Sequence, residues 1–282
     1  MCFRDMNCVT QIQLLGCLDA FGNDAIKVFV ETDDFHSHSA ILPCCKEEGV
    51  ISENWLLQLN QAILREIKGC QIFRQNEIDN RLQELYRNNE NKMLLKECLL
   101  GVSMAVTRIA SCASHRELFE YLGGISGRHL PALCFFDSNG EFWCTKEKDS
   151  LKHVIKKCRE VCRQLEVLEK NNALEDIQHL CQKNELDIEF FSTEKENKVW
   201  EKLQWIEPFD FCSVSAIIQD IREAKAYGKI PILKGELFST EDSYLADLAV
   251  GLNLKLVSFG MPFIGANHIK YNRLIEIESR FV

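Results

Sequence analysis

Two strand–helix patterns follow one another in residues 229–278, which read KIPILKGELFSTEDSYLADLAVGLNLKLVSFGMPFIGANHIKYNRLIEIE. Short apolar runs at 230–233 and 254–259 have the length of buried strands. Each run is followed by apolar residues at helical spacing, over 239–252 and 265–278. Two such units in succession predict a parallel sheet or a (β/α) barrel, so the expected fold class is α/β.

The loops of this stretch mark where chemistry is expected. In a barrel the active site lies at the carboxyl ends of the strands, which here are residues 234–237 and 258–260. Residues 239–242 read Ser-Thr-Glu-Asp, a hydroxyl cap followed by acids. This pattern predicts that the first helix begins there.

The N-terminal part of the chain has a different pattern. Three strands are expected at 9–15, 25–31 and 39–42, and short turns between them predict an antiparallel meander. Apolar spacing predicts two helices within 54–87 and a third over 94–113. This part therefore reads as an α+β unit.

Residues 131–282 are too few for a complete barrel. A full eight-unit barrel takes roughly 250 residues, whereas this part supplies about 150. Four further strands are expected in it, at 132–136, 142–145, 186–191 and 204–208. We therefore expect an incomplete barrel with six strands and two open edges.

Composition excludes several classes of protein. The net charge of −9 argues against binding to a nucleic-acid backbone, which requires a basic face. No apolar run approaches the ~20 residues of a membrane span. The first residues, MCFRDMNCVTQIQ, lack the apolar segment and cleavage site of a signal peptide. We therefore expect a soluble cytoplasmic protein.

The chain contains 14 cysteines, which we expect to be reduced thiols in such a compartment. Cys158 and Cys162 lie four residues apart on one expected helix, and His179 and Cys181 follow. These residues could form a zinc site, but their spacing matches no standard finger. The favoured interpretation is that the thiols are buried as small apolar side chains.

Five blocks of sequence carry a family resemblance. They are CLDAFGNDAIKV at 17–28, LLGVSMAV at 99–106, STED at 239–242, LADLAVGL at 245–252 and KYNRL at 270–274. They resemble, in the same order, the enolase phrases I-L-D-S-R-G-N-P-T-V-E-V, I-L-G-V-S-L-A-V, E-T-E-D, I-A-D-L-x-V-G-L and K-Y-N-x-L. The resemblance implies an enolase N-terminal-like α+β domain over 1–128 and a truncated, incomplete TIM-type barrel over 129–282.

The resemblance also implies an activity. Enolases are phosphopyruvate hydratases, lyases of glycolysis that convert 2-phosphoglycerate to phosphoenolpyruvate with magnesium. Glu141 falls on a catalytic glutamate of the family, although it also fits a hairpin acid after Asn-Gly. Asp187 and Glu207 fall on two magnesium-binding carboxylates, and a purely structural divalent ion at these two residues is an alternative. Because enolases are usually dimers through the N-terminal domain, a homodimer or an enolase-like partner is implied.

The remaining active-site positions differ from the family pattern. The first catalytic lysine has no counterpart, or falls at Glu207, and the second falls at Ser258. The His-Arg-Ser phosphate clamp falls at Gly-Glu-Leu, residues 235–237, where a carboxylate would repel an anionic substrate. We therefore favour an enolase-like pseudoenzyme that acts as a binding or scaffold module. The alternative is a working phosphopyruvate hydratase.

Overall fold

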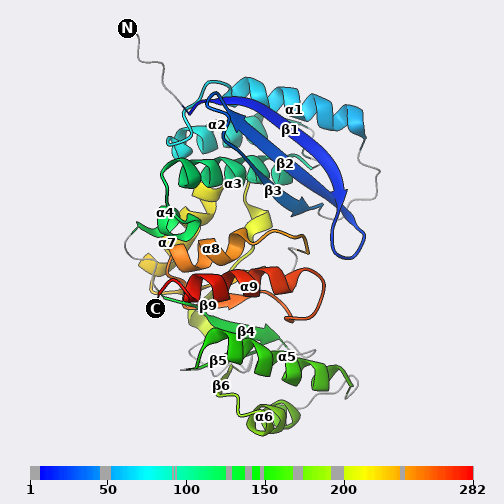
Figure 1. Ribbon diagram of the computed structural model, residues 1–282, viewed down its shortest axis with the longest axis vertical. Coiled ribbons are helices and arrows are strands. Elements are labelled where there is room, and N and C mark those ends of the chain that lie inside the picture. Colours follow the sequence, from blue (N-terminus) through cyan, green and yellow to red (C-terminus); the bar gives the residue numbers. More distant parts are fainter. Residues whose placement is uncertain are drawn as a thin grey trace.

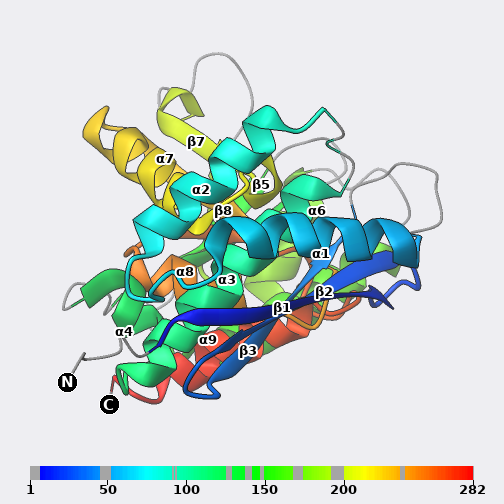
Figure 2. The same ribbon diagram turned by 90° about the horizontal axis from the view of Figure 1, so that it is seen from above.

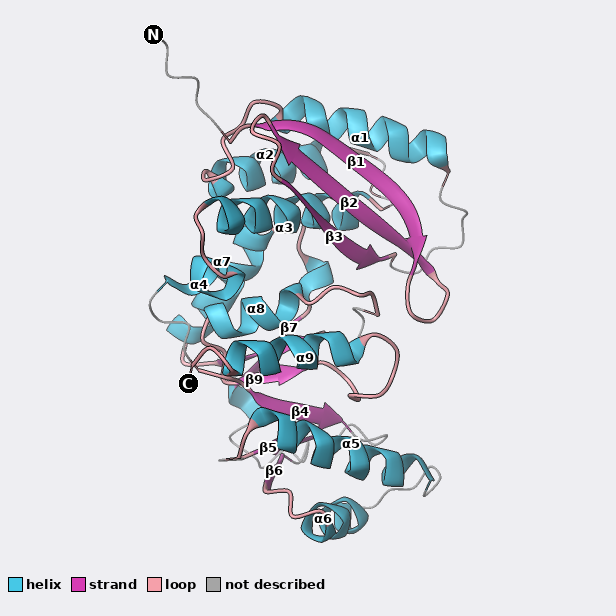
Figure 3. Ribbon diagram, viewed as in Figure 1, coloured by secondary structure: helices cyan, strands magenta, loops and turns pink. Residues whose placement is uncertain are grey.

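Two β-sheets separated by a layer of helices form the architecture (Figures 1 and 3). The computed structural model describes residues 7–44, 52–90, 92, 94–124, 129–136, 142–146, 149–167, 174–191, 200–235 and 239–281. A three-stranded sheet with three helices lies at one end of the molecule, and strands β4–β6 with α5 and α6 lie at the other (Figure 1).

The first sheet is an antiparallel meander, as the sequence predicts. Its strands are β1 (Val9–Leu18), β2 (Asp24–Thr32) and β3 (Ser37–Pro43), in the order β1-β2-β3. Alternate residues of β2, namely Ile26, Val28 and Val30, are fully buried. They pack in one core with residues of α1 (Glu53–Ile67), α2 (Gln75–Asn88) and α3 (Leu95–Ala113).

Helix α3 is buried on both sides. Val102 and Val106 belong to the core beneath the meander, whereas Leu100 and Met104 belong to the core of the second sheet. A β-carbon at Gly101 would lie 2.6 Å from Cγ2 of Val28, so only glycine permits this approach. The LLGVSMAV block is therefore a packing element that joins the two cores.

The second sheet has the order β6-β5-β4-β9-β8-β7. Strands β7, β8, β9 and β4 are parallel neighbours, and β4, β5 and β6 are antiparallel neighbours. The six strands are β4 (Ala132–Phe136), β5 (Phe142–Thr145), β6 (Ile188–Phe191), β7 (Leu203–Ile206), β8 (Ile230–Lys234) and β9 (Leu256–Ser258).

Six more helices accompany this sheet in the described part of the chain. They are α4 (Leu118–Gly123), α5 (Leu151–Val167), α6 (Leu174–Lys183), α7 (Val214–Ala226), α8 (Tyr244–Gly251) and α9 (Asn267–Glu278). None of the described helices is long and apolar enough to cross a bilayer.

The predicted α/β class is confirmed, but a truncated barrel is not. All six expected strands form, yet β6 and β7 end the strand order, and no pairing between described residues joins them. The chain passes from β4 to β5 through residues 137–141 only. A parallel connection needs a dozen or more residues, so β5 must return antiparallel. The result is an open, mixed sheet.

Cys134 and Cys144 form a disulfide between β4 and β5. The two residues are directly opposite in the antiparallel register, with their Cα atoms 4.3 Å apart. The expectation of reduced thiols is therefore wrong for this pair, because only the strand register reveals that they face each other. Both residues are buried beside Ile232 of β8.

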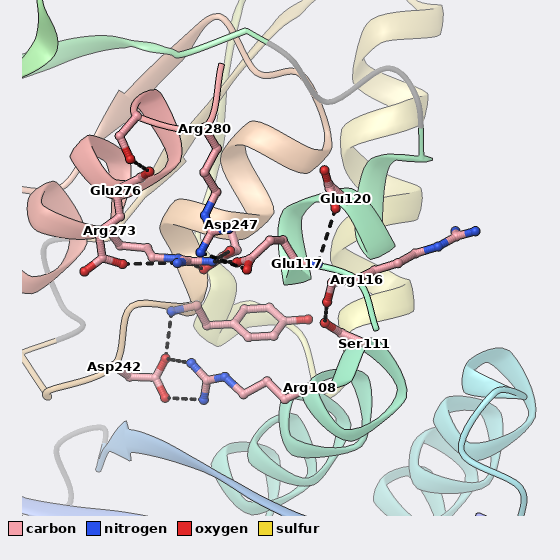
Figure 4. Close-up of polar contacts among 12 residues, drawn as sticks. Arg108, Ser111, Arg116, Glu117, Glu120, Asp242, Asp247, Arg273, Glu276 and Arg280 are labelled. Carbon is pink, nitrogen blue, oxygen red and sulfur yellow. Dashed lines mark hydrogen bonds and ion pairs between the residues drawn. The ribbon is translucent and has the colours of Figure 1, made fainter. Parts of the chain in front are cut away.

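A buried ion pair links the two halves of the molecule (Figure 4). Arg108 of α3 donates to both carboxylate oxygens of Asp242, at 2.9 and 2.7 Å. The same carboxylate accepts the backbone N–H of Ile41 on β3 at 3.0 Å and that of Tyr244 at 2.8 Å. Asp242 thus connects the meander, α3 and the start of α8.

The residues before α8 bind the first sheet instead of beginning the helix. Thr240 donates its hydroxyl to the carbonyl oxygen of Ile41 at 2.8 Å, and the Ser239 hydroxyl donates to the Asp19 carboxylate in the β1–β2 turn. Helix α8 begins at Tyr244, with Ser243 at the N-cap. The prediction of a helix start at 239–242 is therefore wrong, because these polar side chains have tertiary partners.

Two further contacts connect the halves. Arg273 of α9 donates to Asp247 of α8 at 2.7 and 2.9 Å and to Glu117 at 2.9 Å (Figure 4). Helix α2 lies beside α7 (Figure 2), where buried Asp79 accepts the backbone N–H of Ser215 at 2.9 Å. The interface is therefore held by charged and polar groups at several points.

We predict that Asp242→Asn lowers the free energy of unfolding by about 3 kcal/mol, because it leaves the buried Arg108 charge without its partner. The control is Glu77→Gln, which removes a half-exposed ion pair with Arg81 and should cost less than about 1 kcal/mol. Chemical denaturation measures both, and equal values would contradict a dominant role for Asp242.

The stability that the Arg108–Asp242 ion pair contributes depends on pH. Burial alone would raise the pKa of Asp242, but the Arg108 guanidinium and two backbone N–H groups hold it below its usual range. The stabilisation is therefore present above the pKa of an unfolded aspartate, about 3.9, and is lost as the pH falls through the lower folded value.

Candidate functional site

Three polar residues lie at the carboxyl ends of neighbouring parallel strands. Glu207 follows β7, Lys234 ends β8 and Ser258 ends β9. Lys234 and Ser258 are partners in the strand register, and the N–H of Gly235 donates to the carbonyl oxygen of Ser258 at 2.7 Å. This is the edge where a parallel α/β sheet commonly carries its binding site.

An ion pair occupies this edge. Lys234 Nζ lies 2.7 Å from Glu207 Oε1, and each side chain is 31% exposed. The ammonium group also lies 5.5 Å from the centre of the Trp205 ring, within range of a cation–π contact. Because Trp205 and Glu207 are two residues apart, both point to the face of the sheet from which Lys234 projects.

This geometry does not fit a magnesium site. Magnesium requires an octahedral set of oxygen ligands, usually with carboxylates as anchors. Glu207 is instead engaged by a cation, and Ser258, which ends β9 on the far side of β8, is fully buried. Across the described ranges, no three His, Cys, Asp or Glu side chains lie together in a group that could hold a metal ion.

The structure does not bring Asp187 to Glu207. Asp187 immediately precedes β6, and its carbonyl oxygen accepts the N–H of Lys146 at 3.0 Å. Strand β6 is parallel to β4, because both are antiparallel to β5. Asp187 therefore lies at the amino ends of the strands and Glu207 at the carboxyl ends, on opposite edge strands. Glu141 lies outside the described residues.

Family positions of the phosphate clamp fall partly outside the described residues. Gly235 is described, but Glu236 and Leu237 are not. Ser258, which the resemblance aligns with the second lysine of the family, ends β9 and is fully buried. A serine hydroxyl cannot replace a lysine as a proton acceptor at neutral pH.

The sequence did not point to Lys270, which is fully buried in α9. Its ammonium donates to the Asn267 side chain at 3.2 Å, and burial lowers the pKa of Lys270 to about 8. Buried lysines with lowered pKa are candidates for proton transfer. In the sequence, Lys270 stands out only as the first residue of the KYNRL block. The apolar spacing there predicts a helix but does not mark Lys270 as a functional residue.

The zinc alternative finds no support in the described residues. Cys158, Cys162 and Cys181 are all buried in the main core. Burial raises the pKa of the Cys181 thiol to about 12, which disfavours the thiolate that zinc requires. The favoured interpretation of these cysteines as buried apolar side chains is confirmed.

The fold and this edge define an α/β protein whose parallel strands end in a lysine–carboxylate pair. No profile of a known protein family matches the chain. The chain is, however, similar to curated enolases. It is 30% identical over 149 residues to the enolase of Campylobacter jejuni (strain RM1221), covering 47% of this chain and 36% of that enolase. The enolase of a Nitratiruptor species is 30% identical over 157 residues, covering 49% and 37%.

The resemblance to enolase is therefore confirmed as that of a divergent, enolase-like sequence. The match spans little more than a third of the length of these relatives. It does not by itself extend their activity to this chain.

We predict that titration of the chain with magnesium chloride in a calorimeter gives no saturable heat. The physical reason is that Asp187 and Glu207 lie at opposite ends of the sheet and Glu207 pairs with Lys234. The Campylobacter enolase, titrated in the same buffer, serves as the reference. A saturable heat that Glu207→Gln or Asp187→Asn abolishes would contradict this prediction and support a structural ion.

Proposed function

We propose that this chain is an enolase-like protein without phosphopyruvate hydratase activity, which acts as a binding or scaffold module. One observation carries the proposal: Lys234 Nζ pairs with Glu207 Oε1 at 2.7 Å, at the strand ends where the family resemblance places catalytic groups. The pair occupies both side chains with each other, so neither the ammonium nor the carboxylate is directed at a substrate in this arrangement.

The hydratase reaction needs several groups at once. A lysine must remove a weakly acidic proton, and magnesium must stabilise the negative charge that develops on the substrate. By the resemblance, the first catalytic lysine of the family has no counterpart here or falls at Glu207, and the second falls at Ser258. Loss of a general base alone costs about 10²–10⁴ in rate, and loss of the metal ligands adds to that.

The domain organisation and location are part of the proposal. We propose an N-terminal domain over 1–128 and a C-terminal domain over 129–282 derived from a shortened TIM-type barrel. The core beneath the meander supports this division, because its buried members all lie within residues 9–110. A cytoplasmic location, as is typical of enolases, is proposed with it.

A direct assay tests the function. We expect the purified chain with 2-phosphoglycerate and magnesium to form no phosphoenolpyruvate above the buffer rate, while the Campylobacter enolase at equal concentration turns over. Phosphoenolpyruvate is measured by its ultraviolet absorbance. Turnover by this chain that Lys270→Met abolishes would establish the alternative, a working phosphopyruvate hydratase with glycolytic activity.

A homodimer through residues 1–128 is a second element of the proposal. Strand β1 is the edge of the first sheet, and the nearby Leu15, Leu18 and Phe21 are 40, 66 and 59% exposed. Edge strands with exposed apolar residues favour pairing with another chain.

We expect sedimentation velocity to show a dimer that Leu18→Glu dissociates. The control is Leu57→Glu on α1, which changes a side chain that is 54% exposed and should leave the dimer intact. A monomer at all accessible concentrations, or equal effects of the two variants, would contradict the dimer without bearing on catalysis.

A further inference from the structure

A cavity of about 630 Å³ lies at the amino ends of the parallel strands, away from Glu207 and Lys234. Its volume falls within the roughly 300–1,000 Å³ of small-molecule sites. Ala132 at the start of β4 lies on its wall, with Lys255 immediately before β9 and Lys146 immediately after β5. Leu130, Pro131 and Leu254 add an apolar wall.

The acidic groups of the cavity have partners within the protein. Glu278 accepts the backbone N–H of Leu151, the first residue of α5, at 2.7 Å. Asp149 lies 3.3 Å from the ammonium group of Lys157. Each carboxylate is therefore already stabilised by a positive group or by a helix N-terminus.

The two lysines of the cavity wall, Lys146 and Lys255, differ in whether an acidic side chain pairs with them. Lys146 lies 3.4 Å from Glu189 on β6. Lys255 is exposed, and none of the described acidic side chains forms an ion pair with it. Lys255 is thus the cation on the cavity wall whose charge the described acids leave unbalanced.

A second cation increases the positive potential beside Lys255. Lys225 of α7 donates to the carbonyl oxygens of Leu252 and Asn253, at 2.6 and 3.2 Å. Burial, together with the positive charge of Lys255, lowers the pKa of Lys225. The two ammonium groups are therefore close enough to repel, in a chain whose net charge is −9.

Asn253 lies where these features meet. It lines the cavity, and its buried side-chain oxygen Oδ1 has no hydrogen-bond partner among the described residues. Unsatisfied buried polar atoms are uncommon, and a bound molecule is one source of the missing donor. A ligand with a hydroxyl or amide N–H near its anionic group would supply one.

We propose that this cavity binds a small organic anion, with its acidic group at Lys255 and its apolar body against Leu130, Pro131 and Leu254. The anion balances the charge of Lys255, and Lys225, which does not line the cavity, adds to the positive potential there. The apolar wall favours an anion with a hydrocarbon or aromatic body over a bare inorganic ion. The site is separate from the strand ends that the enolase resemblance concerns.

The probe is 8-anilinonaphthalene-1-sulfonate, an aromatic anion whose fluorescence rises in apolar sites. We expect saturable binding to the full chain that Lys255→Gln weakens about fivefold, the value of one exposed charge contact. Lys68→Gln is the matched control, because it removes an exposed lysine at the end of α1, beside the first sheet, whereas the cavity adjoins β4 and β5 (Figure 1). It should leave the affinity unchanged.

A neutral probe separates charge from apolar contact. N-phenyl-1-naphthylamine lacks the sulfonate, so Lys255→Gln should not change its binding. Inorganic phosphate, at constant ionic strength, should displace the anionic probe only weakly. Strong displacement by phosphate would instead assign the site to compact anions. Equal affinity of wild type and Lys255→Gln for the anionic probe, or an equal loss in Lys68→Gln, would overturn the proposal.

Discussion

The buried pair of Arg108 and Asp242 is the contact on which the two halves of this molecule depend. A carboxylate removed from water is costly unless cations and N–H groups surround it. Asp242 is 5% exposed and accepts from the Arg108 guanidinium and from two backbone N–H groups. Because these donors come from β3, α3 and the start of α8, the carboxylate is satisfied only when all three elements are in place. The relative position of the two sheets follows from that condition.

The blocks that match enolase contribute to the packing within each half of the molecule and to the contact between the halves. Gly101 permits α3 to approach β2, Asp242 accepts from Arg108, and Asp247 accepts from Arg273. Gly251 lies against the backbone of α4, where a β-carbon would lie 2.7 Å from the carbonyl oxygen of Phe119. The strand ends depart from the family pattern, so the resemblance is carried by packing and interface residues more than by groups suited to chemistry.

Much of the secondary structure could be predicted from apolar periodicity. The meander, the helices beneath it and the six later strands all form within a few residues of the expected positions. The start of α8 could not be predicted in this way. The hydroxyl groups at 239 and 240 could cap a helix, but in the structure they bind Asp19 and Ile41 instead. The Cys134–Cys144 disulfide was likewise inaccessible, since it depends on the register of two strands.

The candidate site also has features that the sequence determines and features that only the tertiary structure decides. The sequence by itself determined the α/β class, the enolase resemblance and the unusual residues Glu207 and Ser258. Only the tertiary structure decided that Glu207 pairs with Lys234 and that Asp187 lies at the other end of the sheet. The physical reason is that chain order does not specify which strands become neighbours or the direction in which they run. Strand pairing sets both, and with them which charged side chains can meet.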